Sequence, residues 1–421
     1  MKRHAHLTAA LTLAVTTLFF TFTSCSSDDD FGYAEKDAFY GDLSAIGDEN
    51  GSGCSQDTVF HHGILTAGEW DDLAHWSYWS CLMNMSQFNT HNGYWKFYTN
   101  NRVPVTVTDA SGRALAGVKV QLRRAANDAV VWEAQTDNHG EADCWVGLFQ
   151  EETAESASLR MAVEGRLMEG TPLVYGWGTD TLSSDTTQGK PTVVEQPIIR
   201  NTYVLASAPS VERSADIAFV VDATGSMSDE IGFLRSDLQD IIEKASDVHP
   251  EVALRTAALF YRDEDDEYLT RHSNFTDQVK KTAKFVSEQQ ADGGGDYPEA
   301  VHSALNSMLQ DLSWNEKART KIAFLILDAP AHDTDKIIVS LQQSVKLCAA
   351  QGIRIIPVAA SGVDKNTEFM LRYFAMATGG TYVFLTDDSG VGNSHLIASV
   401  GPYQVELLNN LLIRLIGEYT E

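Results

Sequence analysis

The sequence predicts two folded domains in series, an antiparallel β-sandwich followed by a doubly wound α/β domain. Between residues 102 and 205, short segments of alternating apolar and polar residues are separated by turn signals such as Asp-Ala-Ser-Gly. This pattern is typical of an antiparallel sandwich. Further along, fully apolar runs at 217–221 and 322–327 alternate with amphipathic segments. They indicate strands buried on both faces that alternate with helices, as in a doubly wound sheet.

Changes of pattern divide the chain into six parts. The region after the leader is rich in Gly, Ser, Asp and Asn, which is typical of a tether. The parts are a lipoprotein signal peptide at 1–24, the tether at 25–52, an aromatic-rich segment at 53–101 predicted to pack on the sandwich, the sandwich at 102–205, a linker at 206–215 and the α/β domain at 216–421.

The charge of the chain excludes one class of partner. Asp and Glu number 58 against 31 Lys and Arg, which gives a formal net charge of −27. A surface of this sign repels phosphate backbones, so no nucleic acid is expected to bind. It suits a secreted protein that must stay soluble or that gathers cations.

The N-terminal residues have the features of a targeting signal. An apolar stretch at 7–22 has the length of a signal-peptide core. It ends in Phe22-Thr-Ser-Cys25, which resembles the lipobox of bacterial lipoproteins, and the acidic run at 28–30 resembles the export tag of Bacteroidota-type surface lipoproteins. The resemblance implies lipidation of Cys25 and a protein anchored in the outer membrane, facing the exterior, with membrane contact only through the lipid. The alternative is ordinary cleavage, with Cys25 an incidental thiol.

The other cysteines give weaker signals. Cys54 and Cys81 flank one N-terminal segment, and an oxidising envelope would let them form a disulfide. Cys144 and Cys348 lie in apolar contexts typical of buried thiols. None of the four has the spacing of zinc ligands.

Aromatic residues crowd the segment 53–101. They could form a platform on which sugar rings stack, or they could pack onto the sandwich and cover its edge. The alternation Tyr-Trp-Lys-Phe-Tyr at 94–98 is typical of a strand that leads into the next domain, and it favours packing.

A candidate metal site follows the first apolar strand. Asp222, Thr224 and Ser226 stand where ligands bind in doubly wound sheets. Their oxygens suit a divalent cation, with Mg²⁺ favoured and Mn²⁺ or Ca²⁺ as alternatives. Two hydroxyls leave the cation under-neutralised, so the carboxylate of a partner can take an open coordination position. Helix capping would suit the same residue types and is the alternative.

Three more segments agree with one family. They are Tyr261-Arg-Asp263, Gly293-Gly-Gly-Asp-Tyr-Pro-Glu299 and Asp328-Ala-Pro330. With Asp222-x-Thr-x-Ser they resemble the von Willebrand factor type A domain, in the subgroup found in hemicentins and beside some alpha-kinases. The resemblance covers about residues 214–418 and implies a Rossmann-like fold with a metal-ion-dependent adhesion site.

The resemblance also assigns the other loops of the site. Asp328 matches the aspartate of the third loop. The second loop of the family usually offers a Thr, and here Tyr297 aligns with it. Because a phenol is too long for that contact, Asp296 is predicted to bind instead. Glu299 is expected to cap its helix or to pair nearby, and the acidic run at 263–267 to form a solvated loop or, alternatively, a second calcium site.

These observations predict a cell-surface lipoprotein that binds a protein or matrix ligand carrying an acidic group. The sequence has no Gly-x-Ser-x-Gly elbow, His-Glu-x-x-His motif or P-loop, so no enzyme is predicted. Residues 102–205 resemble the carboxypeptidase-regulatory-like repeat, which implies a spacer or interaction module. The alternatives are an envelope scaffold with a structural metal and a glycan-binding surface protein that uses the aromatic segment.

Overall fold

The computed structural model describes residues 63–152, 155–178, 193–207, 209–248, 250–295, 297–392 and 394–420. These residues belong to one compact unit. The signal peptide, Cys25, the tether, Cys54 and Asp296 lie outside the described ranges, so the predictions made for them stay predictions. Within those ranges, no helix combines the length and the apolar character needed to cross a bilayer.

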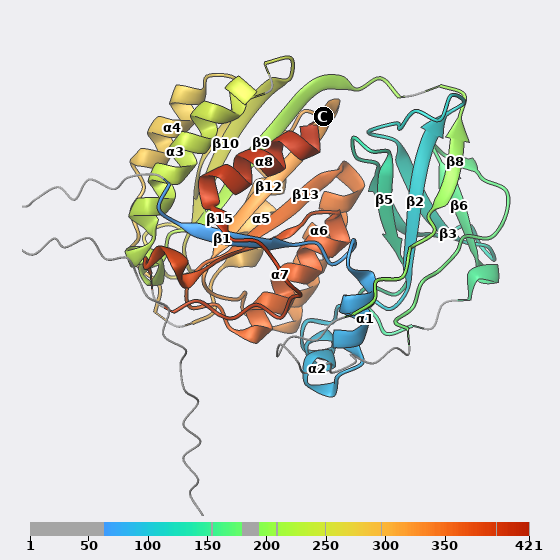
Figure 1. Ribbon diagram of the computed structural model, residues 1–421, viewed down its shortest axis with the longest axis horizontal. Helices are drawn as coiled ribbons and strands as arrows, with labels where there is room; N and C mark the ends of the chain where they lie inside the picture. Colours follow the sequence, from blue (N-terminus) through green and yellow to red (C-terminus); the bar gives the residue numbers. More distant parts are fainter. Residues whose placement is uncertain are drawn as a thin grey trace, which may run out of the picture. The chain divides into compact units, whose positions relative to one another are not determined.

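An eight-stranded sheet organises the larger part of the chain, in the order β11-β10-β9-β12-β13-β14-β1-β15 (Figure 1). Its parallel centre contains β10 (Ala253–Tyr261), β9 (Glu212–Asp222), β12 (Ala318–Leu327), β13 (Ile353–Ala359) and β14 (Tyr382–Leu385). On one side β11 (Thr270–Thr276) pairs antiparallel with β10, and on the other β1 (Thr66–Trp70) pairs antiparallel with both β14 and β15 (Glu406–Leu407).

Helices cover both faces of this sheet because its central strands are apolar on both faces. Along β9, Ile217, Phe219 and Val221 belong to one core, whereas Ala218 and Val220 belong to the other, and none of the five is exposed. The first core is closed by α3 (Ile231–Val248), α4 (Val279–Ser287) and α8 (Leu408–Thr420), and the second by α5 (Val301–Gln310), α6 (Asp335–Gln351) and α7 (Lys365–Thr378).

Parallel strands flanked by helices confirm the doubly wound prediction for this part of the chain. The predicted linker at 206–215 is too long, because β9 already begins at Glu212. The strand β11 was not predicted. Its residues, Thr-Arg-His-Ser-Asn-Phe-Thr, are mostly polar and none is fully buried, so they carry no apolar pattern.

The prediction that the segment 53–101 packs on the sandwich is incomplete. One part of this segment, β1, is a strand of the large sheet. Ala67 lies opposite Leu385 of β14 on one side and opposite Glu406 of β15 on the other. Figure 1 shows β1, in blue, beside β15 and the red helix α8. The hydroxyls of Thr66 and Thr386 are 2.8 Å apart although 320 residues separate them. A five-residue strand carries no sign of so distant a partner.

Two helices, α1 (Trp76–Met83) and α2 (Ser86–Trp95), bury the aromatic residues of the same segment. The ring of Trp79 is fully buried, with its centroid 5.7 Å from that of Tyr373 on α7. Trp76 lies on the other side, 6.1 Å from Trp145. Trp70, Trp95 and Phe97 are at most 5% exposed. Rings buried in this way cannot stack on a sugar, which favours packing over the platform.

The prediction of a strand at 94–98 is wrong. Helix α2 runs to Trp95, and Lys96 ends it in the left-handed conformation with φ 55°. The apparent alternation therefore comes from the last turn of a helix followed by a reversal of the chain, and only tertiary packing distinguishes these two cases.

Residues 102–205 form two smaller sheets. One has the order β5-β2-β8 and the other β4-β3-β6-β7. Their strands are β2 (Arg102–Asp109), β3 (Lys119–Arg124), β4 (Val130–Gln135), β5 (Glu141–Trp145), β6 (Leu159–Val163), β7 (Arg166–Leu167) and β8 (Asn201–Leu205). Of the short 3-10 helices, η1 (Ser156–Ser158) lies in this region. The other two, η2 (Gly225–Asp229) and η3 (Asp387–Ser389), lie in the α/β part.

The predicted antiparallel pairing is wrong for one pair of these strands, because β2 and β8 run parallel. Asn201 of β8 lies opposite Val105 of β2. Tyr175, between β7 and β8, forms an isolated bridge with Arg102 at the start of β2. The buried alternation of Val103, Val105 and Val107 on β2 is as the sequence indicated, with no exposure at any of the three.

A buried ion pair joins the N-terminal segment to α7. Arg372 is fully buried, and its guanidinium donates to both carboxylate oxygens of Asp72, at 2.6 and 2.8 Å. It also donates to Glu368 at 3.2 Å and lies 4.8 Å from the ring of Trp79. Because all three charges are buried, the loss of the cation would leave Asp72 uncompensated, whereas Glu368 would keep its ion pair with Lys365 at 2.9 Å.

Two cysteines are buried, as the sequence indicated. Cys144 and Cys348 are fully buried, and burial raises the pKa of both thiols. Cys81 lies on α1 and is 2% exposed. Its disulfide with Cys54 stays a prediction.

Candidate metal centre

The predicted site residues gather at the carboxyl ends of two neighbouring strands. Asp222 is the last residue of β9, and Asp328 follows β12 directly. These strands are parallel and paired up to Val221 and Ile326, so their ends meet at the same edge of the sheet. Asp222 and Asp328 are 0% and 4% exposed. The fold therefore brings two carboxylates together inside the molecule.

The loop after β9 orients its oxygens through short hydrogen bonds. One carboxylate oxygen of Asp222 accepts from the backbone N–H of Thr224 at 2.9 Å and from its hydroxyl at 2.7 Å. The hydroxyls of Thr224 and Ser226 are 3.1 Å apart. Thr224 makes no side-chain capping bond to η2. Its hydroxyl is thus held by Asp222, contrary to the capping alternative.

A glycine loop closes over this arrangement. The N–H of Gly225 donates to the carbonyl of Gly293 at 3.1 Å. A Cβ at position 225 would lie 2.8 Å from that carbonyl oxygen, so only glycine allows the approach. Gly294 adopts φ +74°, and a Cβ there would lie 3.4 Å from Cβ of Thr224. The Gly293-Gly-Gly segment therefore lies directly against the loop after β9.

Tyr297, which follows this loop, points its hydroxyl elsewhere. The hydroxyl donates to the carbonyl of Gly362 at 3.1 Å and accepts from the N–H of Asp364 at 3.2 Å. This agrees with the view that a phenol cannot replace the usual Thr. Asp296, the predicted substitute, lies outside the described residues, so its role stays a prediction.

Glu299 is a site residue that the sequence did not reveal. It was expected to cap its helix or to pair nearby, but α5 begins without a side-chain capping bond. Its side chain is 2% exposed, and its Oε2 has no hydrogen-bond partner among the described residues. Its position at the end of the Gly-Gly-Gly-Asp-Tyr-Pro-Glu motif was the available signal, although an acidic residue near a helix start is normally read as a cap.

The carboxyl groups of the site have raised pKa values, chiefly because they are buried. Burial raises the pKa of Asp222 to about 6. Burial and the charge of Asp222 raise the pKa of Asp328 to about 7, although a hydrogen bond from Ser226 opposes the rise. Burial, followed by the charges of Asp222, Asp263, Asp328 and Asp266, raises the pKa of Glu299 to about 9.

Two orphaned oxygens lie at the centre of this cluster. Oδ2 of Asp222 and Oδ1 of Asp328 are buried and have no hydrogen-bond partner within the described ranges. Buried polar atoms are nearly always satisfied, so these two oxygens call for a further partner. A divalent cation fits, because it would satisfy both oxygens and lower the energy of the ionised forms.

The donor set also fits the chemistry of a hard cation. In the described part of the chain, no three His, Cys, Asp or Glu side chains are arranged to hold a metal by themselves. The cluster combines the carboxylates of Asp222 and Asp328 with the hydroxyls of Thr224 and Ser226, and such oxygen ligands suit Mg²⁺, Mn²⁺ or Ca²⁺.

Part of the acidic run 263–267 has a structural role that the solvated-loop prediction missed. Asp266 accepts from the N–H of Gly294 at 2.9 Å, and Asp263 lies 2.9 Å from Nε2 of His332. The Asp266 contact fixes the glycine loop, and the Asp263 contact joins the end of β10 to the segment after β12. Glu264, Asp265 and Glu267 are exposed, as expected of a solvated loop.

These features define a doubly wound α/β domain with a candidate cation site at the carboxyl ends of its strands. Residues 216–387 match the family model of the von Willebrand factor A domain. The chain thus contains such a domain over these residues. Domains of this family typically mediate protein–protein interactions and are generally not enzymes.

Two relatives match about a third of the chain or less. A putative ariadne-like RING finger protein of Acanthamoeba polyphaga mimivirus is 33% identical over 117 residues, covering 28% of this chain and 11% of that protein. The alpha-protein kinase vwkA of Dictyostelium discoideum is 29% identical over 140 residues, covering 32% of this chain and 22% of that protein. The chain therefore spans less than a quarter of either relative's length.

One solved structure similar to this chain is that of the conserved hypothetical protein BatB from Bacteroides thetaiotaomicron. It covers 49% of this chain and 98% of that chain, with 10% sequence identity and a TM-score of 0.35.

Proposed function

We propose that the von Willebrand factor A domain binds a protein or matrix ligand through a divalent cation held by Asp222, Thr224, Ser226 and Asp328. The pair of buried, unpartnered oxygens on Asp222 and Asp328 carries the proposal. When bound, the cation would act as a Lewis acid that attracts an anionic oxygen of the ligand. Mg²⁺ is the favoured ion, with Mn²⁺ and Ca²⁺ as alternatives, and Asp296 is a further proposed ligand.

The residues of the chain have separate tasks in this proposal. Asp222 supplies negative charge and fixes the hydroxyl of Thr224 by accepting a hydrogen bond from it. Ser226 is exposed, so it stands on the side from which a ligand would approach. Gly225 and Gly294 allow the two loops to meet without side chains between them. Asp328 closes the site from β12.

Several finer features belong to the same proposal. The motifs support the subgroup of hemicentins and alpha-kinase-associated proteins. The two small sheets at 102–205 would be a carboxypeptidase-regulatory-like sandwich that acts as a spacer. Lipidation of Cys25 would anchor the protein in the outer membrane, with the domain facing the exterior.

One observation favours a second candidate, an envelope scaffold in which the metal is structural. Burial raises the pKa of the Glu299 carboxyl to about 9, and the nearby charges of Asp222 and Asp328 contribute to the rise, so this carboxylate lies close to both. If Glu299 is drawn onto the cation, the chain itself fills the open position. The cation would then stabilise the fold without attracting a ligand.

Water relaxation with Mn²⁺ separates the two candidates. A bound Mn²⁺ with an open, water-filled position accelerates relaxation of solvent protons, and a closed one does not. We expect strong acceleration in the full chain, which glutarate, as a carboxylate probe, should reduce. Glu299→Gln should weaken Mg²⁺ binding by about tenfold, as is usual for groups that support a metal site, and leave the acceleration high.

The control is Glu288→Gln, an exposed residue at the end of α4, which should bind Mg²⁺ like the natural chain. Weak acceleration that becomes strong only in Glu299→Gln would support the scaffold and contradict the binding proposal. Absence of Mn²⁺, Mg²⁺ and Ca²⁺ binding by calorimetry would contradict both.

A further inference from the structure

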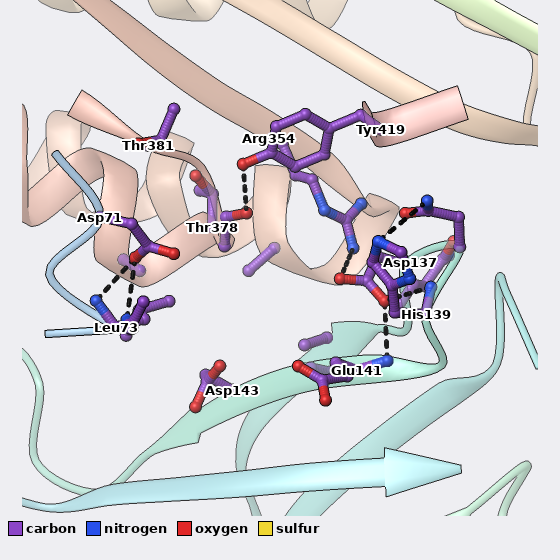
Figure 2. A pocket seen from close by; sticks show the side chains of 18 of the residues that line it. Asp71, Leu73, Asp137, His139, Glu141, Asp143, Arg354, Thr378, Thr381 and Tyr419 are labelled. Carbon is purple, nitrogen blue, oxygen red and sulfur yellow. Dashed lines mark hydrogen bonds and ion pairs between the residues drawn. The ribbon is translucent and has the colours of Figure 1, made fainter. Parts of the chain in front are cut away.

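A polar cavity lies at the other end of the large sheet, away from the candidate metal centre. Its volume is about 350 Å³, which is within the range of small-molecule sites. Three parts of the chain line it (Figure 2). They are the turn between β1 and α1 with Asp71, the strand β5 with Glu141 and Asp143, and the ends of α7 and α8 together with Arg354 at the start of β13.

The cavity contains buried polar atoms without partners. Asn138 is 7% exposed, and its amide nitrogen donates to the carbonyl of Glu418 at 2.8 Å. This bond fixes the amide orientation, so that Oδ1 is an acceptor without a donor among the described residues. Nε of Arg354, which is 5% exposed, is likewise a donor without an acceptor. Such atoms call for a ligand or ordered water that can both donate and accept.

The lining is also too acidic for its own cations. Its charged residues are Glu69, Asp71, Asp137, Glu141, Asp143, Glu418, Arg102, Arg200 and Arg354, an excess of three negative charges. Most of these carboxylates have a cationic partner. Asp143 pairs with Arg102 at 2.7 Å and with Arg200 at 3.4 Å, while Arg414 holds Glu69 and Glu418 at 3.3 and 3.0 Å.

Two carboxylates remain undercompensated, on opposite sides of the cavity (Figure 2). Among the described residues, the Asp71 carboxylate accepts hydrogen bonds only from the backbone N–H groups of Leu73 and Ala74, at 2.7 and 3.2 Å. Glu141 lies 3.5 Å from Arg200, a cation that it shares with Asp143. Burial raises the pKa of both carboxyl groups, although Arg102 opposes the rise at Asp71 and Arg200 opposes it at Glu141.

We propose that this cavity binds a small organic cation, a primary amine that also carries hydroxyl groups. The ammonium group would lie between Asp71 and Glu141 and donate to Oδ1 of Asn138. A hydroxyl would accept from Nε of Arg354. Amino sugars and amino alcohols have this combination. The negative excess disfavours anions, and the polar lining disfavours apolar molecules.

Calorimetry on the full chain tests the proposal with glucosamine and ethanolamine as probes, and with glucose as the uncharged counterpart. A chelator keeps divalent cations out of the measurement. We expect both amines to bind and glucose to bind at least tenfold more weakly. Asp71→Asn and Glu141→Gln should each weaken amine binding at least tenfold. Asp71→Asn keeps an acceptor for the two backbone N–H groups, so it should fold.

The matched control is Glu155→Gln, which removes the same charge from an exposed residue between β5 and β6. It should bind the amines like the natural chain, as should Asp222→Asn at the metal centre. The proposal is overturned if neither amine binds, if glucose binds as well as glucosamine, or if amine binding survives both cavity substitutions.

Discussion

Asp222→Asn is expected to abolish the stabilisation of the protein by divalent cations. The substitution keeps the size of the side chain and removes the charge that would anchor the ion. A ligand at a hundred times its Kd stabilises a fold by about 2.7 kcal/mol. Saturating Mg²⁺ should therefore raise the Tm of the natural chain by about 5–10 °C and leave that of the variant unchanged. Thermal unfolding with Mg²⁺ and with chelator measures both.

The pH dependence of the cation-free protein gives the same prediction an independent readout. The pKa values of about 6 for Asp222, about 7 for Asp328 and about 9 for Glu299 exceed the ordinary values of 3.8, 3.8 and 4.5. Between each pair of values the folded chain retains a proton that the unfolded chain has released. Raising the pH therefore favours unfolding, by about 1.4 kcal/mol per pH unit for each proton.

The contribution of these groups to stability is thus fully present below about pH 4 and is lost progressively up to about pH 9. The stability of Asp222→Asn should decrease less steeply with pH over this window. Saturating Mg²⁺ should remove the decrease in the natural chain. The control Asp265→Asn changes an exposed residue of the acidic run and should leave both curves as they are. A variant that Mg²⁺ still stabilises, or that unfolds in chelator, would sink the prediction.

Arg372→Met is expected to have the largest effect on stability. Met fills much of the space of the arginine stem but leaves Asp72, at 3% exposure, without its counter-charge, and leaves the fully buried Glu368 with Lys365 alone, at 2.9 Å. Breaking a buried ion pair from one side costs about 3–5 kcal/mol. The free energy of unfolding, followed in urea by tryptophan fluorescence, should fall by that amount.

Arg213→Met is the matched control for this substitution. Arg213 pairs with Glu251 at 3.3 Å, but its side chain is 60% exposed, and such pairs contribute about 0–1 kcal/mol. A loss in Arg372→Met no larger than that of the control would show that Asp72 and Glu368 find other partners or become protonated.

The fold of the α/β part could be predicted because its signals are local. Apolar runs at 217–221 and 322–327 specify strands buried on both faces, wherever their partners lie. The strand β1 could not be predicted. It pairs with residues some 320 positions away, and its five residues resemble any short half-buried segment. Burial of Trp79 and Trp95 agrees with the predicted packing of the aromatic segment, but their partners could not be predicted, because the covering residues come from α7.

The residues of the candidate site also fall into two groups, those that the sequence predicts and those that it does not. Asp222, Thr224, Ser226 and Asp328 stand directly after strands, so their position in the sequence fixes their place at one edge of the sheet. Glu299 reaches the same place through the path of the glycine loop, and Asp266 through its bond to Gly294. These contacts depend on three-dimensional loop geometry, which residue spacing does not encode.

The position of β1 between β14 and β15 has a mechanical consequence. Tension applied at the amino end of this strand would act along its length. The hydrogen bonds to both neighbours would then be loaded in shear and would have to fail together rather than one after another. Behind it, the turn held by Arg372 would bear the load next. A protein tethered from its amino end would thus hold its carboxyl-terminal helix and its cation-binding edge in shape while the tether is under strain.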